Sequence, residues 1–293
     1  AQFAAHTGLS MKSLSTWLPF LSWPKLTREL FKSEASAGFV VALLMVPQSV
    51  AYAALAGMPL VTGLYAALLP AVVGVMWGGS SRLSIGPSAL TCVLISASLM
   101  GMAEPVSAHW VNLAVWLALM AGALQLMMGV LQYGWLLNLI SSPVMMGFTQ
   151  AAGLLVMASQ IPAITGWHAG GTVQWGDLAF GACSLAALFA AKKWLPKWPS
   201  IMLVVAASAI VSYGIGYAEH GGAVIGSLPN SLPSLSLPHV LSWEELGMLA
   251  GPAVLIALVS FLEAASSAKT ENQKEGTLWQ ENQDLIGQGL AKI

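Results

Sequence analysis

The stretch SRLSIGPSALTCVL, residues 81–94, breaks a long apolar run where a membrane-spanning helix would be expected to continue. A helix needs about 20 apolar residues to cross the hydrocarbon core of a bilayer, yet Gly86, Pro87 and Ser88 interrupt this run. A helix that begins at Ser88 and ends at Met102 is about 22 Å long, which is short of a core about 30 Å thick. We therefore predict a half-helix that begins near the middle of the membrane.

The start of this half-helix has the features of an anion-binding site. Residues 83–86 would cross half of the membrane as extended chain, which is tolerated only where protein or water satisfies the backbone. Pro87 fits the first helical position, and we expect Ser88 and Ala89 to leave their amide groups unpaired. Free amides and the positive end of the helix dipole attract anions, and broken helices of this kind mark the binding sites of transporters. The alternative is a proline kink in a continuous span.

The composition places the whole chain in a lipid environment. Of the 293 residues, 57% are hydrophobic and only 8% are charged, so the chain cannot present a normally solvated surface. The net charge is -1 and no basic patch is interleaved with aromatic residues, so no nucleic acid partner is expected. The two cysteines have no metal-ligand spacing. We expect no cofactor apart from a coupling proton or sodium ion.

Apolar runs predict an all-α protein that crosses the bilayer many times. The expected spans are 36–56, 60–78, 86–102, 110–131, 136–161, 177–195, 200–217 and 247–268, and a ninth begins near Leu285. Residues 218–246 are rich in Gly, Pro and Ser and are expected to form an external loop. Residues 1–11 resemble a non-native remnant, and residues 12–35 suit an amphipathic lead-in that lies on the membrane surface.

The positions of lysine and arginine predict a cytoplasmic amino terminus in a cell-membrane protein. In this orientation the outer loops hold no lysine or arginine, and they contain several acidic residues and four of the five histidines. The cytoplasmic side then carries Lys12, Lys25, Arg28, Lys32, Arg82, Lys192, Lys193, Lys197, Lys269 and Lys274. This alternation predicts eight crossings before Lys269.

Two further spans carry polar residues at mid-depth, where an unpaired polar group is costly. In the first span, Pro47 removes one backbone hydrogen bond, and Gln48 and Tyr52 lie one turn apart on the same face. Gln48 is compatible with a hydrogen bond to a neighbouring helix and equally with a ligand contact. Glu263 is the only acid deep within a span, at a cost of about 2.5 to 3.5 kcal/mol, and Ser267 follows one turn later.

A cation, a proton or a water-filled cavity must compensate the charge of Glu263. The alternative is a structural role in which this carboxylate accepts hydrogen bonds near the cytoplasmic interface, because Lys269 is close in sequence.

Four segments resemble the sulfate permease (SulP) family of anion transporters, which is related to the animal anion exchangers and prestin. They are PQSVAYAALAGMPLVTGLYAALLPAVVGVMWGGSSRLSIGPSAL at 47–90, SPVMMGFTQAAGLLVMASQIP at 142–162, ALVSFLEAASSAK at 257–269 and NQDLIGQGLAKI at 282–293. The segments occur in family order, and the resemblance extends from about Lys32 to the end of the sequence.

This resemblance implies a fold of two inverted seven-helix repeats, divided into a core and a gate that move in an elevator-like manner. Residues 36–217 would form the first repeat and 247–293 the start of the second. The substrate site would lie between the first, third, eighth and tenth helices. We expect the tenth helix and the family's cytoplasmic STAS domain to lie outside these 293 residues, and the full-length protein to be a homodimer.

The resemblance also assigns roles to residues that the physical reading singles out. We expect the amide ends of the half-helices to hold the anion, without a buried lysine or arginine in this portion. Glu263 matches the position that takes the coupling ion. The substrate-binding positions are Gln48, Tyr52, Ser88, Ala89 and Ser267.

The predicted function is secondary active transport of a small inorganic or organic anion, with sulfate as the first candidate and protons or sodium as the coupling ion. The alternative is an uncoupled anion channel, or an exchanger of bicarbonate, chloride or dicarboxylate; a voltage-responsive motor such as prestin stays open. An enzyme is not expected, because the spans contain no HExxH motif, no paired acids and no histidine with Asp or Ser.

Overall fold

The computed structural model describes residues 19–22, 27–80, 83, 85–139, 142–165, 175–194, 200–217, 219, 237–275 and 279–293. Two short 3-10 helices are η1 (Pro19–Ser22) and η2 (Tyr133–Leu139). The α-helices are α2 (Arg28–Leu55), α3 (Leu60–Trp77), α4 (Ala89–Leu99), α5 (Ala108–Val130), α6 (Ser142–Thr165), α7 (Trp175–Trp194), α8 (Ser200–Gly214), α9 (Trp243–Glu275) and α10 (Glu281–Lys292). The described part of the chain is therefore helical, as predicted.

Several helices have the length and composition of membrane spans. Within the described residues, α2, α3, α5 and the part of α9 up to Lys269 are long and apolar enough to cross a membrane, and α4 and α8 are shorter apolar helices. Large apolar side chains on the outer helices are exposed, including Leu154, Phe189 and Ile210. Water-soluble surfaces rarely expose so much apolar area, so these side chains fit contact with lipid.

Helix bounds differ from the predicted spans where the local sequence starts or stops a helix. α2 begins at Arg28, before residue 36, because the Thr27 side chain accepts a hydrogen bond from the Leu30 amide (3.2 Å) and caps the helix there. α4 ends at Leu99, where the backbone of Met100 turns extended (φ −60°, ψ 124°) and Gly101 follows with φ 91°. The predicted span 136–161 divides into η2 and α6, since Pro143 suits only the first turn of a helix.

The end of the sequence also departs from the predicted bounds. α9 begins at Trp243, inside the predicted loop, and α10 begins at Glu281 rather than near Leu285. Residues 1–11, most of 12–35 before α2, Arg82, and residues 220–236 of the predicted external loop lie outside the described residues.

A hydrophobic core joins the carboxyl-terminal end of α4 to α5 and α9. Its largest member, Trp110 on α5, is 1% exposed and donates its indole N–H to the carbonyl of Ala56 at the end of α2 (3.0 Å). The other buried members are Leu99, Leu113, Ala114, Leu117, Ala121, Leu241, Leu249, Ala253, Ile256 and Ala257. This packing sets the position of α9 against α5 and α4.

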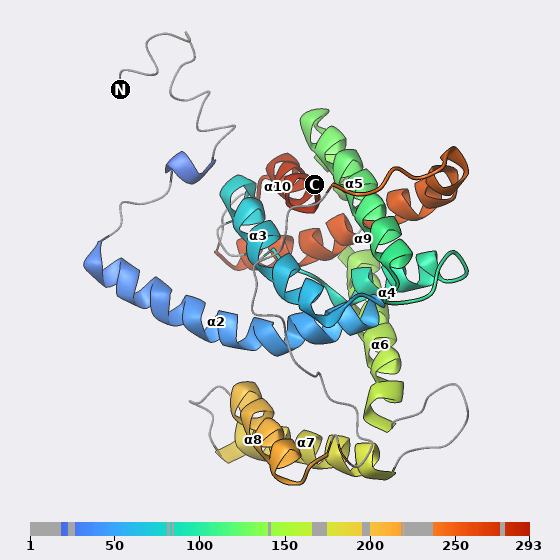
Figure 1. The fold of residues 1–293 in the computed structure, drawn as a ribbon. Coiled ribbons are helices and arrows are strands. Elements are labelled where there is room, and N and C mark those ends of the chain that lie inside the picture. Colours follow the sequence, from blue (N-terminus) through green and yellow to red (C-terminus); the bar gives the residue numbers. More distant parts are fainter. Residues whose placement is uncertain are drawn as a thin grey trace.

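Helix α10 packs directly against α5 and α3 (Figure 1). A side chain on Gly289 would place its Cβ 2.6 Å from the backbone nitrogen of Leu126 and 2.9 Å from the carbonyl oxygen of Gly122 on α5. Contacts under 3.0 Å to backbone cannot be relieved by a rotamer change, so the two helices approach this closely only because glycine is present.

The first turn of α10 is bonded to the end of α3. The buried carboxylate of Asp284 accepts a hydrogen bond from the Gly79 amide (2.5 Å) and another from the Trp279 indole. The side-chain amide of Gln283 donates to the Trp77 carbonyl (2.8 Å). These bonds fix the point from which the chain leaves α3 toward α4.

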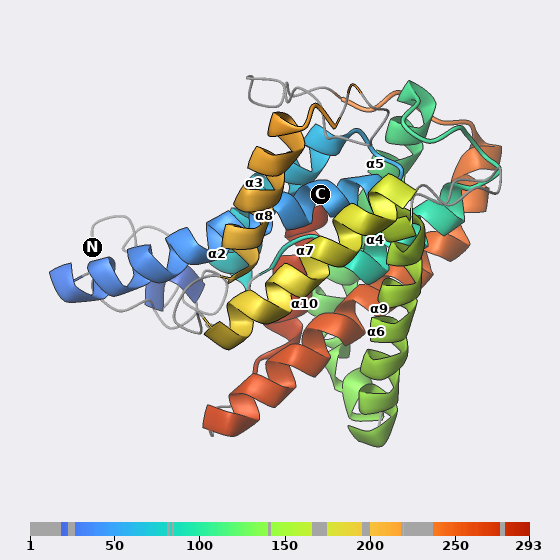
Figure 2. The same cartoon turned by 90° about the horizontal axis from the view of Figure 1, so that it is seen from below.

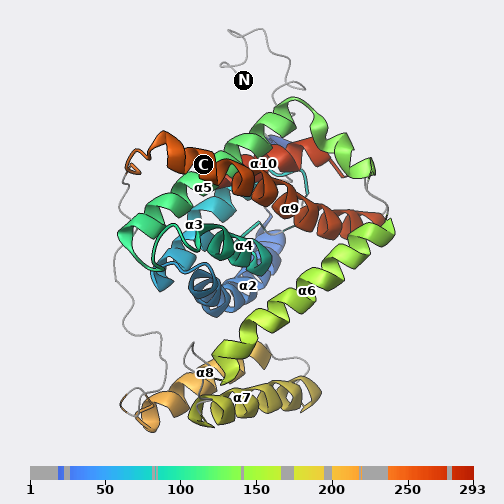
Figure 3. The ribbon, with the colours of Figure 1, turned by 90° about the vertical axis from the view of Figure 1, so that its right-hand side faces the viewer.

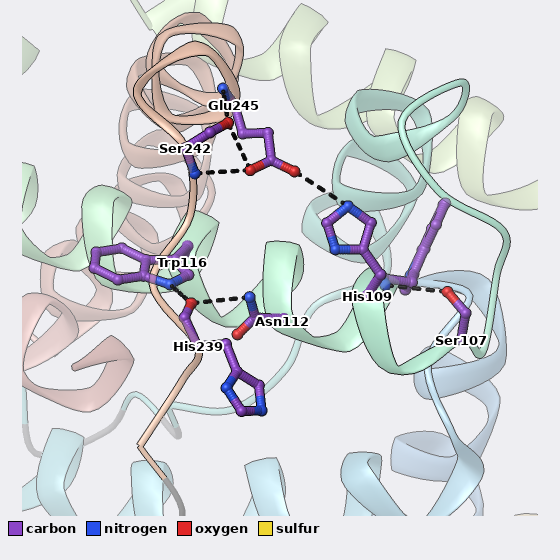
Figure 4. Close-up of polar contacts among 8 residues, drawn as sticks. Ser107, His109, Asn112, Trp116, His239, Ser242 and Glu245 are labelled. Atoms are coloured by element: carbon purple, nitrogen blue, oxygen red, sulfur yellow. Dashed lines mark hydrogen bonds and ion pairs between the residues drawn. The ribbon is translucent and has the colours of Figure 1, made fainter.

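Polar contacts fasten the start of α9 to α5 (Figure 4). Ser242 and Glu245 form a capping box, in which the Ser242 amide donates to the Glu245 carboxylate (2.8 Å) and the Glu245 amide donates to the Ser242 hydroxyl (3.2 Å). Glu245 also lies 3.2 Å from Nε2 of His109. Side chains of Asn112 and Trp116 both donate to the backbone carbonyl of His239 (3.0 and 2.9 Å).

Helix α7 lies at one edge of the molecule, and α8 also contacts α2 of the cluster formed by α2, α3, α4, α5, α9 and α10 (Figure 3). Helices α7 and α8 pack against each other, and α6 leads toward them from the main cluster. The view in Figure 2 shows α6 and α9 as long helices on the same side of the molecule.

We expect Gly289→Ala to destabilise the protein, because the added Cβ would force α10 away from the α5 backbone. Overpacking of this kind costs about 1 to 3 kcal/mol. Gly251→Ala on α9 is the matched control, since nothing lies within 4 Å of its Cβ position, and alanine is the better helix former. Thermal unfolding in detergent should show a lower midpoint for Gly289→Ala only. Equal midpoints for the two variants would contradict this account of the α5–α10 contact.

Candidate functional site

A cavity of about 700 Å³ lies among α2, α3, α4, α5, α9 and α10. Most of the residues predicted to bind substrate or the coupling ion line it: Gln48, Tyr52, Ser88, Glu263 and Ser267. Ala89, the remaining predicted residue, is buried and is not part of the cavity wall. The fold therefore brings Gln48 and Ser267, which are more than 200 positions apart in the sequence, to the same cavity.

The predicted half-helix begins at the cavity. Ser88 has an extended backbone (φ −115°, ψ 146°) and is the N-cap of α4, because its hydroxyl oxygen accepts a hydrogen bond from the Thr91 amide (3.3 Å). Pro87 therefore precedes the cap and isn't the first helical residue, which corrects the predicted position. Ala89 is the first helical residue, and within the described part of the chain the amides of Ala89 and Leu90 have no hydrogen-bond partner.

The segment that enters α4 is not helical. Leu83, Ile85, Gly86 and Pro87 line the cavity in an irregular conformation, as predicted for a chain that crosses part of the membrane beside a polar space. Ile85 packs against α3 at Gly74, where a Cβ would lie 2.8 Å from the Ile85 side chain. This contact sets the course of the segment.

The carboxylate of Glu263 on α9 is hydrogen-bonded to the start of α4. The Ser88 hydroxyl donates to Oε2 of Glu263 at 2.6 Å. Hydrogen bonds to an ionised acceptor are shorter and stronger than neutral ones. Ser267 lies one turn later on α9 and donates its hydroxyl to the backbone carbonyl of Glu263 (3.3 Å). Glu263 thus faces the amide end of the half-helix.

Gln48 and Tyr52 form their own pair on the α2 wall. The side-chain amide of Gln48 donates to the Tyr52 hydroxyl oxygen at 2.7 Å, which confirms that the two lie on one face of the helix. In the described residues Gln48 makes this contact within α2 and none to another helix. The phenol oxygen accepts from Gln48, so its own O–H can be donated to a ligand in the cavity.

A lysine in the cavity wall is the main feature that the sequence reading missed. The expectation of a site without a buried lysine or arginine is wrong, because the partly buried Lys292 on α10 lines the cavity. Its ammonium group donates to the side-chain oxygen of Gln125 (2.6 Å) and to the Ser260 hydroxyl (2.7 Å), and its charge interacts with that of Glu263. A lysine inside the predicted ninth span was the signal that could have revealed it.

Comparison with protein families and curated proteins gives consistent matches. The family model described as the sulfate permease family matches residues 31–293. The chain is 31% identical to the chloroplastic sulfate transporter 4.1 of Arabidopsis thaliana, over 96% of this chain and 44% of that protein. It is 29% identical to a probable sulfate transporter of Mycobacterium tuberculosis (94% of this chain, 52% of that protein).

A further relative is the sodium-independent sulfate anion transporter of Bos taurus, which is 29% identical (97% of this chain, 54% of that protein). The chain spans about half the length of these relatives.

Solved structures share the fold. The murine Solute Carrier 26 family member A9 anion transporter, in its inward-facing state, superposes with a TM-score of 0.81 at 20% identity, covering 99% of this chain and 55% of that chain. The transmembrane domain of the cyanobacterial bicarbonate transporter BicA gives a TM-score of 0.76 at 19% identity, covering 92% of this chain and 72% of that chain. The chain belongs to the sulfate permease family.

Proposed function

We propose that this chain forms the anion-binding part of a secondary active transporter, with sulfate as the first candidate substrate and Glu263 as the residue that takes the coupling ion. The observation that carries the proposal is the hydrogen bond from the Ser88 hydroxyl to Glu263 (2.6 Å) at the open end of α4. The names of the relatives from Arabidopsis thaliana, Mycobacterium tuberculosis and Bos taurus support sulfate.

Coupling follows from the place of the Glu263 carboxylate. This carboxylate faces the amide end of α4 that would also attract the substrate anion. Two negative charges about 4 Å apart repel strongly in a medium of low dielectric constant. An anion at the start of α4 therefore binds well only when a proton or a sodium ion neutralises Glu263. Binding of the anion and binding of the cation then favour each other.

The name of the bovine relative, a sodium-independent transporter, supports the proton as the first coupling ion to test. A single carboxylate suffices to bind a proton, whereas a sodium ion needs several oxygen ligands. The neighbouring oxygens of Ser88 and Ser267 keep sodium as the second candidate.

The arrangement of helices supports an elevator-like movement. The residues that line the cavity come from α2, α3, α4, α5, α9 and α10 and the segments that join them, and these helices pack as one cluster, whereas α7 and α8 pack on each other and contribute no described residue to the lining (Figure 3). In the proposed mechanism the first group carries the anion across the bilayer past the second group. The family resemblance adds a homodimer in a cell membrane, with the amino terminus in the cytoplasm.

An uncoupled anion channel, or an exchanger of bicarbonate, chloride or dicarboxylate, is the alternative. The same amide end of α4 could bind a permeating anion. Uptake of labelled sulfate by the intact protein in proteoliposomes separates the two, because only a coupled transporter accumulates the anion against its gradient when a proton or sodium gradient is imposed.

If the start of α4 binds the anion, a cysteine at residue 88 should react with a water-soluble thiol reagent, and bound anion should protect it. The background is Cys92→Ala with Cys183→Ala, since Cys92 also lines the cavity. Ser98→Cys is the control, because Ser98 lies on the same helix with its hydroxyl bonded to the Leu94 carbonyl (2.6 Å), away from the cavity. Labelling at residue 88 that no candidate anion reduces would rule out this site.

We expect Gln48→Ala to raise the half-saturating sulfate concentration about three- to tenfold, which corresponds to one lost hydrogen bond of about 0.5 to 1.5 kcal/mol. The amount of folded protein should stay near that of the wild type. Gln160→Ala on α6 is the control, because Gln160 bonds within its own helix, to Ser159 (3.3 Å), and is not part of the cavity wall. A loss of folded protein at unchanged affinity would instead show that Gln48 is a packing residue.

Glu263→Gln should abolish gradient-driven accumulation while anion exchange at equilibrium partly survives. The substitution keeps an oxygen that can accept from Ser88 and removes the charge that binds the coupling ion. Glu244→Gln, in the exposed first turn of the same helix, should behave like the wild type. Uptake is measured with a proton gradient, a sodium gradient or neither. Accumulation that persists in Glu263→Gln would assign coupling to another residue.

A further inference from the structure

Two polar residues on α10 point to a second set of anion contacts in the cavity. Gln288 and Lys292 are four residues apart, so they lie one above the other on the same face of the helix. Both line the cavity that contains Ser88 and Glu263. The family resemblance places the site between the first, third, eighth and tenth helices. The helix labelled α10 is the predicted ninth span, so it is an additional wall of the cavity.

Gln288 has a donor without an acceptor. The residue is 5% exposed, and its Nε2 group is buried and has no hydrogen-bond partner within the described residues. Its other side-chain atom, Oε1, faces Nε2 of Gln125 at 3.4 Å, which is the longest contact of that nitrogen. An unpaired buried donor destabilises a protein, so a small movement of the cavity wall that lets a ligand supply the acceptor would be favourable.

Lys292 retains hydrogen-bonding capacity toward the cavity. An ammonium group has three donors, and within the described residues two are used, by Gln125 and Ser260. Both partners are held in turn, since Gln125 donates to the Ala257 carbonyl (2.8 Å) and Ser260 donates to the Ile256 carbonyl (2.7 Å). The lysine is thus fixed at the wall by neutral oxygens, and an anion in the cavity would favour its charged form.

The charges of the wall suit a doubly charged anion. Once Glu263 is neutralised by its coupling ion, Lys292 is the one charged side chain left among the described residues that line the cavity. The amide end of α4 can hold a monovalent anion without Lys292. A dianion carries one further charge, which Lys292 and the Gln288 donor can stabilise on other oxygens.

We propose that Gln288 and Lys292 form an anion subsite on α10 that selects doubly charged oxyanions, such as sulfate, over monovalent anions. This inference rests on the proposed function, because it assumes that the cavity binds the transported anion. It adds the residues that determine which charge and shape of anion bind there.

The test measures anion binding rather than transport. Purified intact protein is heated in detergent with increasing sulfate, nitrate or chloride, and the concentration that gives half of the maximal rise in melting temperature is compared among variants. We expect Lys292→Gln to raise this concentration at least about tenfold for sulfate, as expected for a lost hydrogen bond to a charged group, and less than about threefold for chloride. Lys292→Arg should restore most of the sulfate affinity, because it keeps the charge.

Gln288→Leu gives a second test that does not depend on a marginally folded variant. Removal of a buried donor without a partner should leave the melting temperature of the anion-free protein unchanged or raise it, while sulfate affinity falls about three- to tenfold. Gln283→Leu on the same helix is the matched control. Gln283 is bonded to the Trp77 carbonyl (2.8 Å), so this variant should melt at a lower temperature with an unchanged ratio of sulfate to chloride affinity.

The outcomes separate the subsite from the proposed function. An unchanged ratio of sulfate to chloride affinity in both Lys292→Gln and Gln288→Leu would overturn the subsite, and a lower melting temperature in Gln288→Leu would show that its amide has a structural partner. Wild-type protein that no anion stabilises would refute the anion site as a whole, and the subsite with it. The third outcome is that the wild type binds sulfate and the variants change this binding as expected, but the wild type never accumulates sulfate. That result would support the subsite and refute coupled transport.

Discussion

The hydrogen bond between Ser88 and Glu263 is the constraint on which the cavity depends. A carboxylate within an apolar helical bundle is costly unless donors surround it, and the start of a helix supplies donors only if the helix begins at that depth. α4 does so because Gly86, Pro87 and Ser88 delay its first turn. The irregular segment before it, in turn, must be supported by α3 and α10. α4, the irregular segment before it and Glu263 therefore depend on one another.

The features that the sequence predicted are those set by local chemistry. The break before α4 follows from the residues 86–88 themselves, and the pairing of Gln48 with Tyr52 follows from their spacing on one helix. Glu263 was recognisable because a lone acid in an apolar span requires compensation. The predicted helical class follows from composition. The orientation of the chain, the number of crossings, the inverted repeats and the homodimer stay predictions.

What could not be predicted depends on contacts between distant parts of the chain. Lys292 and Gln288 reach the cavity only because Gly289 and Gly122 allow α10 to lie against α5, and no local pattern reports that approach. The partner of Glu263 is on α4, and the partner of Asp284 follows α3. Helix ends differ from the predicted bounds because of local contacts, such as the Thr27 cap that starts α2 at Arg28. Propensity sets which segments are helical, whereas packing decides which side chains meet.

The bonds of Asp284 also bear on how the membrane voltage acts on the protein. This residue bonds α10 to the segment that leads into α4, so we expect the wall with Lys292 and the wall with Ser88 to move together. In an elevator-like movement, the unit formed by both walls carries its own charges through the electric field together with its cargo. Each elementary charge that crosses the full field contributes about 2.3 kcal/mol per 100 mV. The electrical work of a transport cycle is then set by the summed charge of Lys292, Glu263, the coupling ion and the anion. A loaded unit whose net charge is zero would cross the field with no electrical work.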